Sequence, residues 1–384
     1  MTETVSWGIV YYGFPAFLQS MEADLGASRV AVTGALSVGL AVSALAALPV
    51  GRWLDRHGPR ALMTFGSCLG TALVVAWSRV DSLAALYAVW LLLGIAMATT
   101  LYEPAFAVVV SWFPRQHRDR ALLTLTLTAG LASTIFMPLE AWLIGRLGWR
   151  TALLTLAAVL GVVTIPLHAL VLRPGPGGAA GPPAGPTGHA PAAGMTLGAA
   201  VRTPVFWVLA ASFFVTNFAT VSLTTHLIPF LTERGYSATV AAATIGWIGA
   251  MQLPGRLLFV PVSAWLGPRW STAGVFFAQA VSLAQLALLG RLVPTLVPIV
   301  LLLGAANGMS TLARATSLAE IFGARHYGSI SGAVGLAANG ARAAGPVGAA
   351  ALWLALGGYA PTFWVLGGAL AAAGLAVLLT PAKD

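Results

Sequence analysis

The sequence predicts an all-α membrane protein in which twelve transmembrane helices form two pseudo-symmetric six-helix bundles. Three observations support this prediction. Hydrophobic residues fill 58% of the 384 positions and charged residues only 8%, whereas about a quarter of the residues in soluble proteins are charged. The apolar residues gather into runs of about 20, the length that crosses a bilayer as a helix. A short motif at the end of the second run recurs at the end of the eighth, which indicates two related halves.

Twelve apolar runs, bounded by charged residues or by Gly and Pro, define the predicted helices. The first run is short by this measure, so its helix is expected either to tilt into the interface or to begin further upstream. The predicted runs are 5–19, 30–50, 61–78, 83–110, 121–147 and 151–172, followed by 205–231, 239–266, 272–289, 292–319, 329–356 and 362–380.

Between the sixth and seventh runs lies a segment that is rich in Pro and Gly and poor in large apolar residues. Such a composition favours neither a helix nor a packed core. The chain is therefore expected to consist of an N-terminal bundle of residues 1–172, a flexible cytosolic linker of residues 173–200 and a C-terminal bundle of residues 201–384.

The arginines are shared unevenly between the two sides of the predicted membrane protein. Ten lie in loops on the side of the linker and six in loops on the other side. Because loops rich in Lys and Arg stay in the cytosol, both termini are predicted to be cytoplasmic. The expected location is the plasma (inner) membrane, where the chain would cross the lipid bilayer many times and work as a monomer.

Other classes of protein are disfavoured by the residue types present. The net charge of +9 comes from arginines at the ends of apolar runs, without a basic stripe or an aromatic platform, which argues against nucleic acid binding. A single cysteine excludes an intramolecular disulfide, and the six scattered histidines have no metal-ligand spacing. No nucleophile–base pattern or cofactor motif is found, so neither an enzyme nor a bound cofactor is expected.

The repeated motif relates the two halves residue by residue. PVGRWL at residues 49–54 recurs as PVSAWL at residues 261–266. This alignment predicts that Gly267 occupies the place that Asp55 has in the first half, so that the second copy has lost its acidic residue. Parallel halves of this kind occur in families of transporters that hold their substrate near the membrane midplane between the halves.

A dense charged turn, GRWLDRHGPR at residues 51–60, interrupts the apolar sequence. It resembles the loop between the second and third helices of major facilitator superfamily transporters, whose pattern is Gly, three residues, Asp-Arg, one residue, Gly, one residue, Arg. WFPRQHRDRA at residues 112–121 and GARHYGSISG at residues 323–332 resemble the loops of that family before helices five and eleven. The resemblance covers essentially the whole chain and implies a twelve-helix secondary transporter.

A narrower resemblance comes from YYGFPAFLQSMEADLGASR at residues 11–29, which is similar to bacterial members of the monocarboxylate and oxalate/formate branch. Drug/proton antiporters of the superfamily carry an arginine four residues before a glycine in helix four, where this chain has Trp90 before Gly94. They also carry a GPxxGG-like kink in helix five, where this chain reads MPLEAW at residues 137–142. The sequence therefore lacks two features that are usual in drug/proton antiporters.

The resemblance also implies a role for the charged turn. In the superfamily its aspartate braces the cytosolic side against the start of helix eleven, so Asp55 is expected to meet the segment 327–332, where N–H groups and the positive end of a helix dipole attract a carboxylate. Arg118 or Arg120 is expected as a further partner. The predicted conformational latch consists of Gly51, Asp55, Arg56, Gly58, Arg60 and Arg118.

Two arginines are predicted at bilayer depth, where a charge is costly and is by default functional. Arg256 lies near the centre of the eighth run and Arg342 near the centre of the eleventh. Planar guanidinium groups match a carboxylate, so two of them at one cavity would favour an anion. The monocarboxylate and oxalate/formate branch carries cations at these places, so the resemblance assigns both arginines to the substrate. The alternative is that each is tied to a carbonyl or a carboxylate between helices.

Polar residues near these arginines complete the predicted substrate site. Gln252 shares a helical face with Arg256, while residues 257–259 are predicted on the opposite, apolar side. The branch often has an aspartate where this chain has Gln252, which counts against proton coupling through this pair. Asn217 could instead bond another helix, and Tyr12 could belong to an interfacial aromatic belt. The other predicted substrate ligands are Asn339, Asn217 and Tyr12.

Carboxylates within the apolar runs are the remaining candidates. Glu103, in the fourth run, is expected either to carry a coupling proton or to form an ion pair with Arg314 or Arg256. Arg314 lies in the cytosolic third of the tenth run and is given a structural or gating role. Glu140 is expected to be an interfacial carboxylate near the outer end of the fifth run.

The predicted function is secondary active transport of a small organic anion, with a monocarboxylate as the expected substrate, by proton symport or anion exchange. The expected partners are a small-molecule substrate and a coupling proton or counter-anion. A multidrug or sugar transporter is one alternative. A membrane sensor or scaffold that keeps the fold without transport is another.

Overall fold

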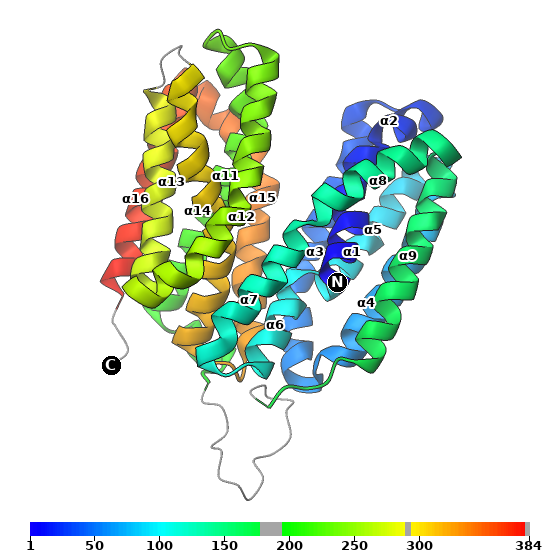
Figure 1. The fold of residues 1–384 in the computed structure, drawn as a ribbon, viewed down its shortest axis with the longest axis horizontal. Coiled ribbons are helices and arrows are strands. Elements are labelled where there is room, and N and C mark those ends of the chain that lie inside the picture. Colours follow the sequence, from blue (N-terminus) through cyan, green and yellow to red (C-terminus); the bar gives the residue numbers. More distant parts are fainter. Residues whose placement is uncertain (177–193, 289–292, 381–384) are drawn as a thin grey trace, which may run out of the picture. The chain divides into compact units, whose positions relative to one another are not determined.

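The computed structural model describes residues 1–176, 194–288 and 293–380, and these residues are mostly helical (Figure 1). No strand occurs among them, and their extended pairing is limited to an isolated bridge between Gly194 and Gly323. The helices before residue 177 are α1 (Thr2–Ser6), η1 (Trp7–Tyr12), α2 (Gly13–Leu25), α3 (Arg29–His57), α4 (Pro59–Trp77), α5 (Leu83–Thr100), α6 (Tyr102–Trp112), α7 (Arg115–Gly130), α8 (Ala132–Leu147) and α9 (Trp149–Leu170). The later helices are α10 (Leu197–Ala200), α11 (Pro204–Glu233), α12 (Ala238–Leu266), α13 (Pro268–Ala287), η2 (Val293–Thr295), α14 (Leu296–Phe322), α15 (Tyr327–Leu356) and α16 (Tyr359–Leu379).

Several of these helices are consecutive pieces of one membrane-crossing segment. The backbone of Leu101 is extended and separates α5 from α6, because Pro104 lacks an N–H group and is tolerated in the first turn of a new helix. α7 and α8 meet at Leu131, and α1, η1 and α2 follow one another without a gap. Counted in this way, the described residues contain twelve segments, six before residue 177 and six after residue 194. Nine stretches of the described chain are long and apolar enough to cross a membrane by length and composition alone.

The chain divides into two compact units. The first unit is Met1–Leu197 together with Phe322–Leu336, and the second is Gly198–Ile321 together with Ala337–Asp384. The start of α15 therefore packs with the first unit although it follows most of the second in sequence. A flexible linker at 173–200 stays a prediction, since its residues 177–193 lie outside the described residues. At the end of this segment the Met195 N–H donates to the Phe322 carbonyl at 2.8 Å.

The core of the first unit is built around aromatic side chains of α2, α4 and α5. Phe14, Phe17, Trp77 and Trp90 are fully buried. The Trp77 and Trp90 ring centroids lie 5.0 Å apart in a T-shaped arrangement, and Phe14 meets Trp90 at 4.7 Å in the same geometry, which the ring quadrupoles favour. Trp90, which stands where drug antiporters carry an arginine, thus contributes to packing.

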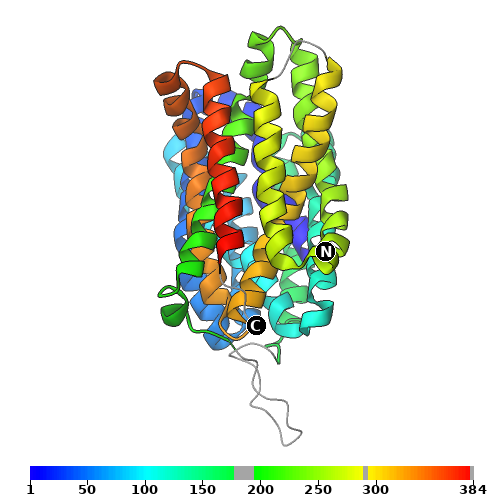
Figure 2. The same cartoon turned by 90° about the vertical axis from the view of Figure 1, so that its left-hand side faces the viewer.

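The second unit is held together by α11, α13 and α16, and α13 and α16 run side by side (Figure 1, Figure 2). Gly374 permits the close approach, because a Cβ added there would lie 3.0 Å from the Phe277 ring. Leu283, Phe363 and Leu370 fill the interface with buried apolar area.

The turns that end α3 and α12 correct the predicted alignment of the halves. Gly58 ends α3 with φ 76°, and Pro59 begins α4. Gly267 ends α12 with φ 79°, and Pro268 begins α13. Gly267 is thus the counterpart of Gly58 and not of Asp55, because both turns need a residue without Cβ at positive φ. The second half lacks any counterpart of residues 55–57.

Candidate functional site

The charged turn meets the first turn of α15 through Asp55. The N–H of Gly328 donates to Asp55 Oδ1 at 2.9 Å, and the N–H of Ser329 donates to Oδ2 at 2.7 Å. Both donors lie in the first turn of a helix, where N–H groups have no partner within the helix and the dipole is positive. Asp55 is buried, so these two bonds are shielded from water. We call this arrangement the brace.

Glycines bring α3 and α15 into backbone contact beside the brace. A Cβ added at Gly51 would overlap the Gly328 carbonyl, and a Cβ added at Gly332 would overlap the Ala47 carbonyl. A Cβ at Gly328 would lie 2.8 Å from Asp55 Oδ1. The short hydrogen bonds of Asp55 thus depend on the absence of side chains at these positions.

The other residues of the predicted latch lie around the turn. Arg56 and Arg60 are exposed, while Gly58 forms the turn. Arg118 is buried on α7, and its Nη2 donates to the Val110 carbonyl at 3.4 Å, near the C-terminal end of α6. A cation at that place is favoured by the helix dipole. A contact of Arg118 or Arg120 with Asp55 stays a prediction.

Arg342, on α15, is held by two of the predicted site residues. Its Nε donates to Asn217 Oδ1 at 2.7 Å, and its Nη1 donates to Asn339 Oδ1 at 3.5 Å. The Asn217 amide is itself oriented, because its Nδ2 donates to the Phe213 carbonyl at 2.8 Å. Arg342 is exposed on the second unit, so a positioned guanidinium stands on the surface of that unit.

Arg256, on α12, is buried with 8% of its surface exposed. The helix packs closely against α14, because a Cβ at Gly255 would overlap the Ala305 carbonyl and a Cβ at Gly308 would overlap the Gln252 carbonyl. The expectation that Phe259 lies opposite Arg256 is wrong. Phe259 is fully buried, while Leu257 and Leu258 are about half exposed, since positions three apart share a helical face.

A polar network that the sequence analysis missed links α11, α13 and α14. Gln279 Nε2 donates to Asn307 Oδ1 at 2.8 Å, and Thr220 Oγ1 donates to the same oxygen at 3.4 Å. Thr216 Oγ1 donates to Gln279 Oε1 at 3.3 Å. The signal was available, since Gln279 and Asn307 are amides within apolar runs, where polar residues usually bond between helices.

Glu103 contacts the same helix as the brace. Ser331 Oγ donates to Glu103 Oε2 at 2.7 Å, and a Cβ added at Gly335 would lie 3.1 Å from Glu103 Oε1. Both contacts are within the first unit. Arg314 is half-buried on α14, in the second unit, so its predicted pairing with Glu103 stays a prediction.

Tyr12 lies in an aromatic group of the first unit. The Trp7 ring centroid is 6.2 Å from that of Tyr12, 4.9 Å from Tyr11 and 4.8 Å from Tyr102. Trp7, Tyr11 and Tyr12 belong to η1, where the helix has π geometry, a form that occurs frequently at functional sites.

Glu140 is not the interfacial carboxylate that the sequence analysis expected. It is fully buried in α8, and its neighbour Gly13 lies at the start of α2. The expectation followed from exposed Arg146, six positions further along the helix, but the helix turns the two side chains to different environments.

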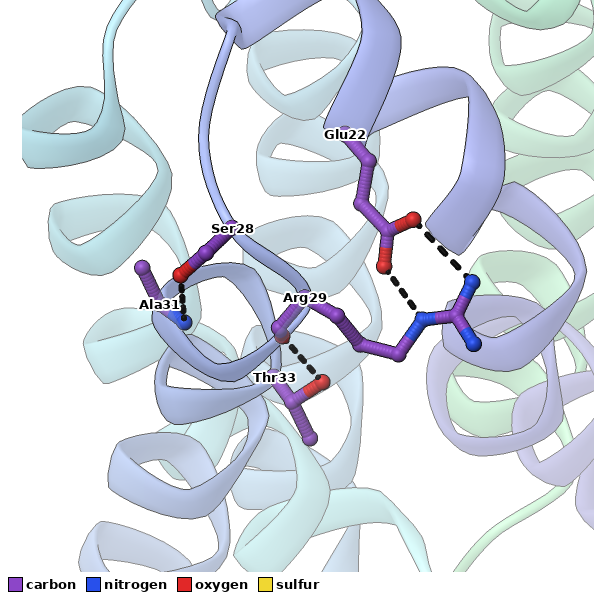
Figure 3. A network of polar contacts seen from close by, with 5 residues as sticks. All are labelled: Glu22, Ser28, Arg29, Ala31 and Thr33. Carbon is purple, nitrogen blue, oxygen red and sulfur yellow. Dashed lines mark hydrogen bonds and ion pairs between the residues drawn. The ribbon is translucent and has the colours of Figure 1, made fainter.

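Charged and polar side chains connect the end of α2 to the start of α3 (Figure 3). Arg29 Nε donates to Glu22 Oε1 at 2.7 Å, and this bond lowers the pKa of Glu22 below its usual value. Ser28 caps α3 by accepting from the Ala31 N–H at 3.3 Å. Nearby, Asp24 accepts from Trp149 Nε1 at 2.8 Å. Among the residues described, no group of His, Cys, Asp and Glu could hold a metal ion.

Comparisons with known sequences extend over most of the chain. A family model described as Major Facilitator Superfamily matches residues 4–346. The chain is 28% identical over 240 residues to the oxalate:formate antiporter of Oxalobacter formigenes, which covers 62% of this chain and 54% of that protein. It is 29% identical over 118 residues to the uncharacterized transporter YybO of Bacillus subtilis (strain 168), which covers 31% of this chain and 27% of that protein. These matches span about half of the first relative and less of the second.

Solved structures share the fold. The human organic anion transporter MFSD10 (TETRAN) is 16% identical with a TM-score of 0.74, covering 98% of this chain and 97% of that one. The E. coli fucose:proton symporter FucP is 12% identical with a TM-score of 0.77, covering 100% and 97%. The proton:xylose symporter XylE is 12% identical with a TM-score of 0.72, covering 97% and 92%. These likenesses confirm the predicted twelve-helix fold class and, at such identities, nothing finer.

Proposed function

Because the chain belongs to the Major Facilitator Superfamily, it is a multi-pass membrane transporter, and we propose that its substrate is a small organic anion, most simply a monocarboxylate. Transport would proceed by alternating access, in which two halves expose a midplane site to each side in turn.

The observation that carries this proposal is the setting of Arg342. It lies within an apolar helix, its Nε is fixed by Asn217, and Asn217 is fixed by its own helix. A guanidinium held in this way presents a planar fork with little freedom left to lose, and such a fork matches the two oxygens of a carboxylate. A charge at bilayer depth is costly, so a charge that is present there is by default functional.

Arg256 supports the same substrate class from α12. It is buried in an apolar helix beside Gln252, within the same unit as Arg342. The Oxalobacter relative is named as an antiporter of oxalate and formate, which are both small carboxylates. The proposed substrate ligands are Arg256, Arg342, Gln252, Asn339, Asn217 and Tyr12.

The brace is the proposed latch for alternating access, because it acts on the helix that carries Arg342. Gly328, which donates to Asp55, and Arg342 are 14 positions apart on α15, about 21 Å at the helical rise of 1.5 Å per residue. Breaking the two Asp55 bonds would release the start of that helix. Gly51, Asp55, Arg56, Gly58, Arg60 and Arg118 are proposed to form this latch.

Coupling would use either a second anion or a proton. Exchange of anions needs no titrating group in the protein, whereas symport needs one. Glu103 is a candidate for the group that binds the proton. Its carboxylate accepts a hydrogen bond from Ser331 on α15, so a movement of that helix would change the surroundings of the carboxylate. The alternative role for Glu103 is an ion pair with Arg314 or Arg256.

Uptake of labelled carboxylates into proteoliposomes tests the proposed function. Arg342→Ala and Arg256→Ala should each abolish uptake, while Arg29→Gln, a change at an exposed arginine that pairs with Glu22, should not alter it. Arg342→Lys keeps the charge and loses the planar fork, so it should raise KM more than it lowers the maximal rate. Undiminished uptake in both alanine variants would refute the anion site.

The same assay separates the rivals. Saturable uptake of a sugar or extrusion of a lipophilic cation, without carboxylate flux, would indicate the sugar or multidrug alternative. The absence of flux for every solute, in protein that binds a ligand, would indicate a sensor or scaffold. Ligand binding is measured independently as a rise in thermal stability, since a ligand that binds only the folded state raises it.

A further inference from the structure

Glu140 is a buried carboxyl group to which the proposed transport mechanism gives no role. Its side chain is completely buried, and neither carboxyl oxygen has a hydrogen-bond partner among the residues that the structure describes. It lies 7 residues before Leu147, the last residue of α8, which is about 10 Å along the helix. The group is therefore well inside the predicted membrane-crossing segment and not at its surface.

The surroundings of Glu140 are apolar and closely packed. A Cβ added at Gly13 would lie 3.2 Å from Glu140 Oε1. Phe136 and Leu143, on the same helix, belong to a buried apolar cluster with Phe14 and Phe17 of α2. Because Gly13 has no side chain, the carboxyl group of Glu140 fits beside it, among the apolar side chains of α2 and α8.

Ionisable groups on the helices packed against α8 are engaged elsewhere or carry no opposite charge. Asp24 on α2 pairs with Arg150 on α9, and the charged residues of α7 lie in its first turns, residues 115–120. Tyr11 and Tyr12 on η1 contact the Trp7 ring, Tyr11 edge-on and Tyr12 at a tilt. The remaining groups are Glu3 on α1, Glu22 on α2, His168 on α9 and Arg146 on α8 itself.

Two of these remaining groups have partners of their own. Glu22 pairs with Arg29, and His168 Nδ1 lies 2.7 Å from Ser67 Oγ. Arg146 is exposed, and Glu3 is itself a buried acid. No cation on these helices therefore compensates a negative charge at Glu140.

An ionised carboxylate in such a place would lose its hydration without gaining a partner, a cost far above that of burying the neutral acid. The helices around it are also irregular. η1 has π geometry immediately before Gly13, Pro15 follows in α2, and Pro138 lies two residues before Glu140 within α8. Helices change direction most easily at such points, so this interface is suited to open and close.

We propose that Glu140 is a proton-binding site of the first unit, protonated while the interface between α2 and α8 is dry and deprotonated when that interface admits water. One carboxyl group takes up one proton from one side and releases it to the other. The proposal rests on the proposed transport function only for the consequence that this proton is coupled to anion movement.

Infrared difference spectroscopy of the purified chain tests the protonation without any transport. The wild type should show, at neutral pH, the C=O band of a protonated carboxylic acid without hydrogen bonds. Glu140→Gln should remove its own part of this band and leave the part that belongs to the other buried acid, Glu3, which Glu3→Gln identifies. Glu22→Gln, at a partly exposed carboxylate that pairs with Arg29, should leave the band unchanged. A spectrum that Glu140→Gln does not alter would overturn the proposal.

Gly13→Ala keeps the acid and tests the geometry if Glu140→Gln does not fold. The added Cβ must displace the carboxyl group slightly, so the band should shift in frequency without disappearing. A band that keeps its frequency would place the protonated acid elsewhere and refute the assignment.

Coupling is tested with proteoliposomes under an imposed pH gradient. A proton gradient directed into the vesicles, with the outside acidic, should stimulate formate uptake. This stimulation should be lost in Glu140→Gln and retained in Glu22→Gln. Retained stimulation in Glu140→Gln would overturn the coupling role even if the band is lost. A wild type that transports no carboxylate would refute the proposed function, while the infrared band would still decide whether Glu140 binds a proton.

Discussion

At the scale of single residues, the orientation of one amide determines what Arg342 can do. Asn217 donates to its own helix through Nδ2, which leaves Oδ1 directed at the guanidinium. The bond between them crosses from α11 to α15, and 125 positions separate the two residues in the chain. A polar residue within an apolar run is easily recognised in a sequence, but its hydrogen-bond partner depends on how the helices pack.

Asn217→Ala should weaken binding of the transported anion. The Arg342 fork would lose a hydrogen bond to its charged group, and such bonds contribute about 1.5–3 kcal/mol, which corresponds to a rise in KM of about tenfold or more. Asn217→Asp keeps the acceptor but adds a negative charge that competes with the substrate, so it should raise KM as well. KM for uptake measures both effects, and unchanged KM in the alanine variant would show that Asn217 does not position the arginine.

Glu140 and Phe259 show where reasoning from single residues failed. Glu140 was expected at an interface from its place in a run, but α2 covers it and Gly13 makes room for it. Phe259 was placed opposite Arg256, although residues three apart share a face. The first error arose from unknown packing, and the second was avoidable with the sequence alone.

At the scale of helices, the contact between α3 and α15 is determined by what the glycines lack. Gly51, Gly328 and Gly332 allow the two backbones to touch, so that Asp55 reaches two N–H groups at the start of α15. The resemblance of the charged turn to a known loop indicated the facing segment. It could not indicate the bond geometry, which depends on the crossing of two helices far apart in sequence.

Asp55→Asn should weaken the brace and shift the chain toward the state open to the cytosol. The variant loses a charged acceptor for two helix N–H groups, and it should slow transport without abolishing ligand binding. The measurement is thiol labelling from the cytosolic side at Ala44→Cys on α3, after Cys68, the single cysteine, is replaced by serine. Labelling should rise in Asp55→Asn and stay at its starting level in Asp81→Asn, an exposed position in a turn. Equal labelling in both variants would contradict a latch.

At the scale of the whole molecule, two units share one helix. The first ten residues of α15, Tyr327 to Leu336, pack with the first unit and the rest of α15 with the second. This division of α15 does not follow the order of the chain, and the predicted bundles of residues 1–172 and 201–384 stay a prediction. The division of α15 arises because the glycines at the start of α15 fit against α3 more closely than a bulkier helix would allow.

The arginine distribution predicts that both termini lie in the cytosol, and tagged chains test it. An epitope appended at the C-terminus should be reached by antibody only after the cells are made permeable, because arginine-rich loops are retained inside. An epitope inserted at Gly26, in the turn between α2 and α3, should be reached in intact cells. The opposite pattern would invert the assigned topology.

Run length, composition and turn motifs are enough to identify this chain as a twelve-segment membrane protein of the Major Facilitator Superfamily, because they are local properties that the bilayer selects. The folded chain was needed to show that Asp55 bonds the first turn of α15, that Asn217 holds Arg342 and that Glu140 is buried against Gly13. These pairings join residues distant in the chain, and in a chain composed mostly of similar apolar helices they depend on where small side chains let two backbones approach.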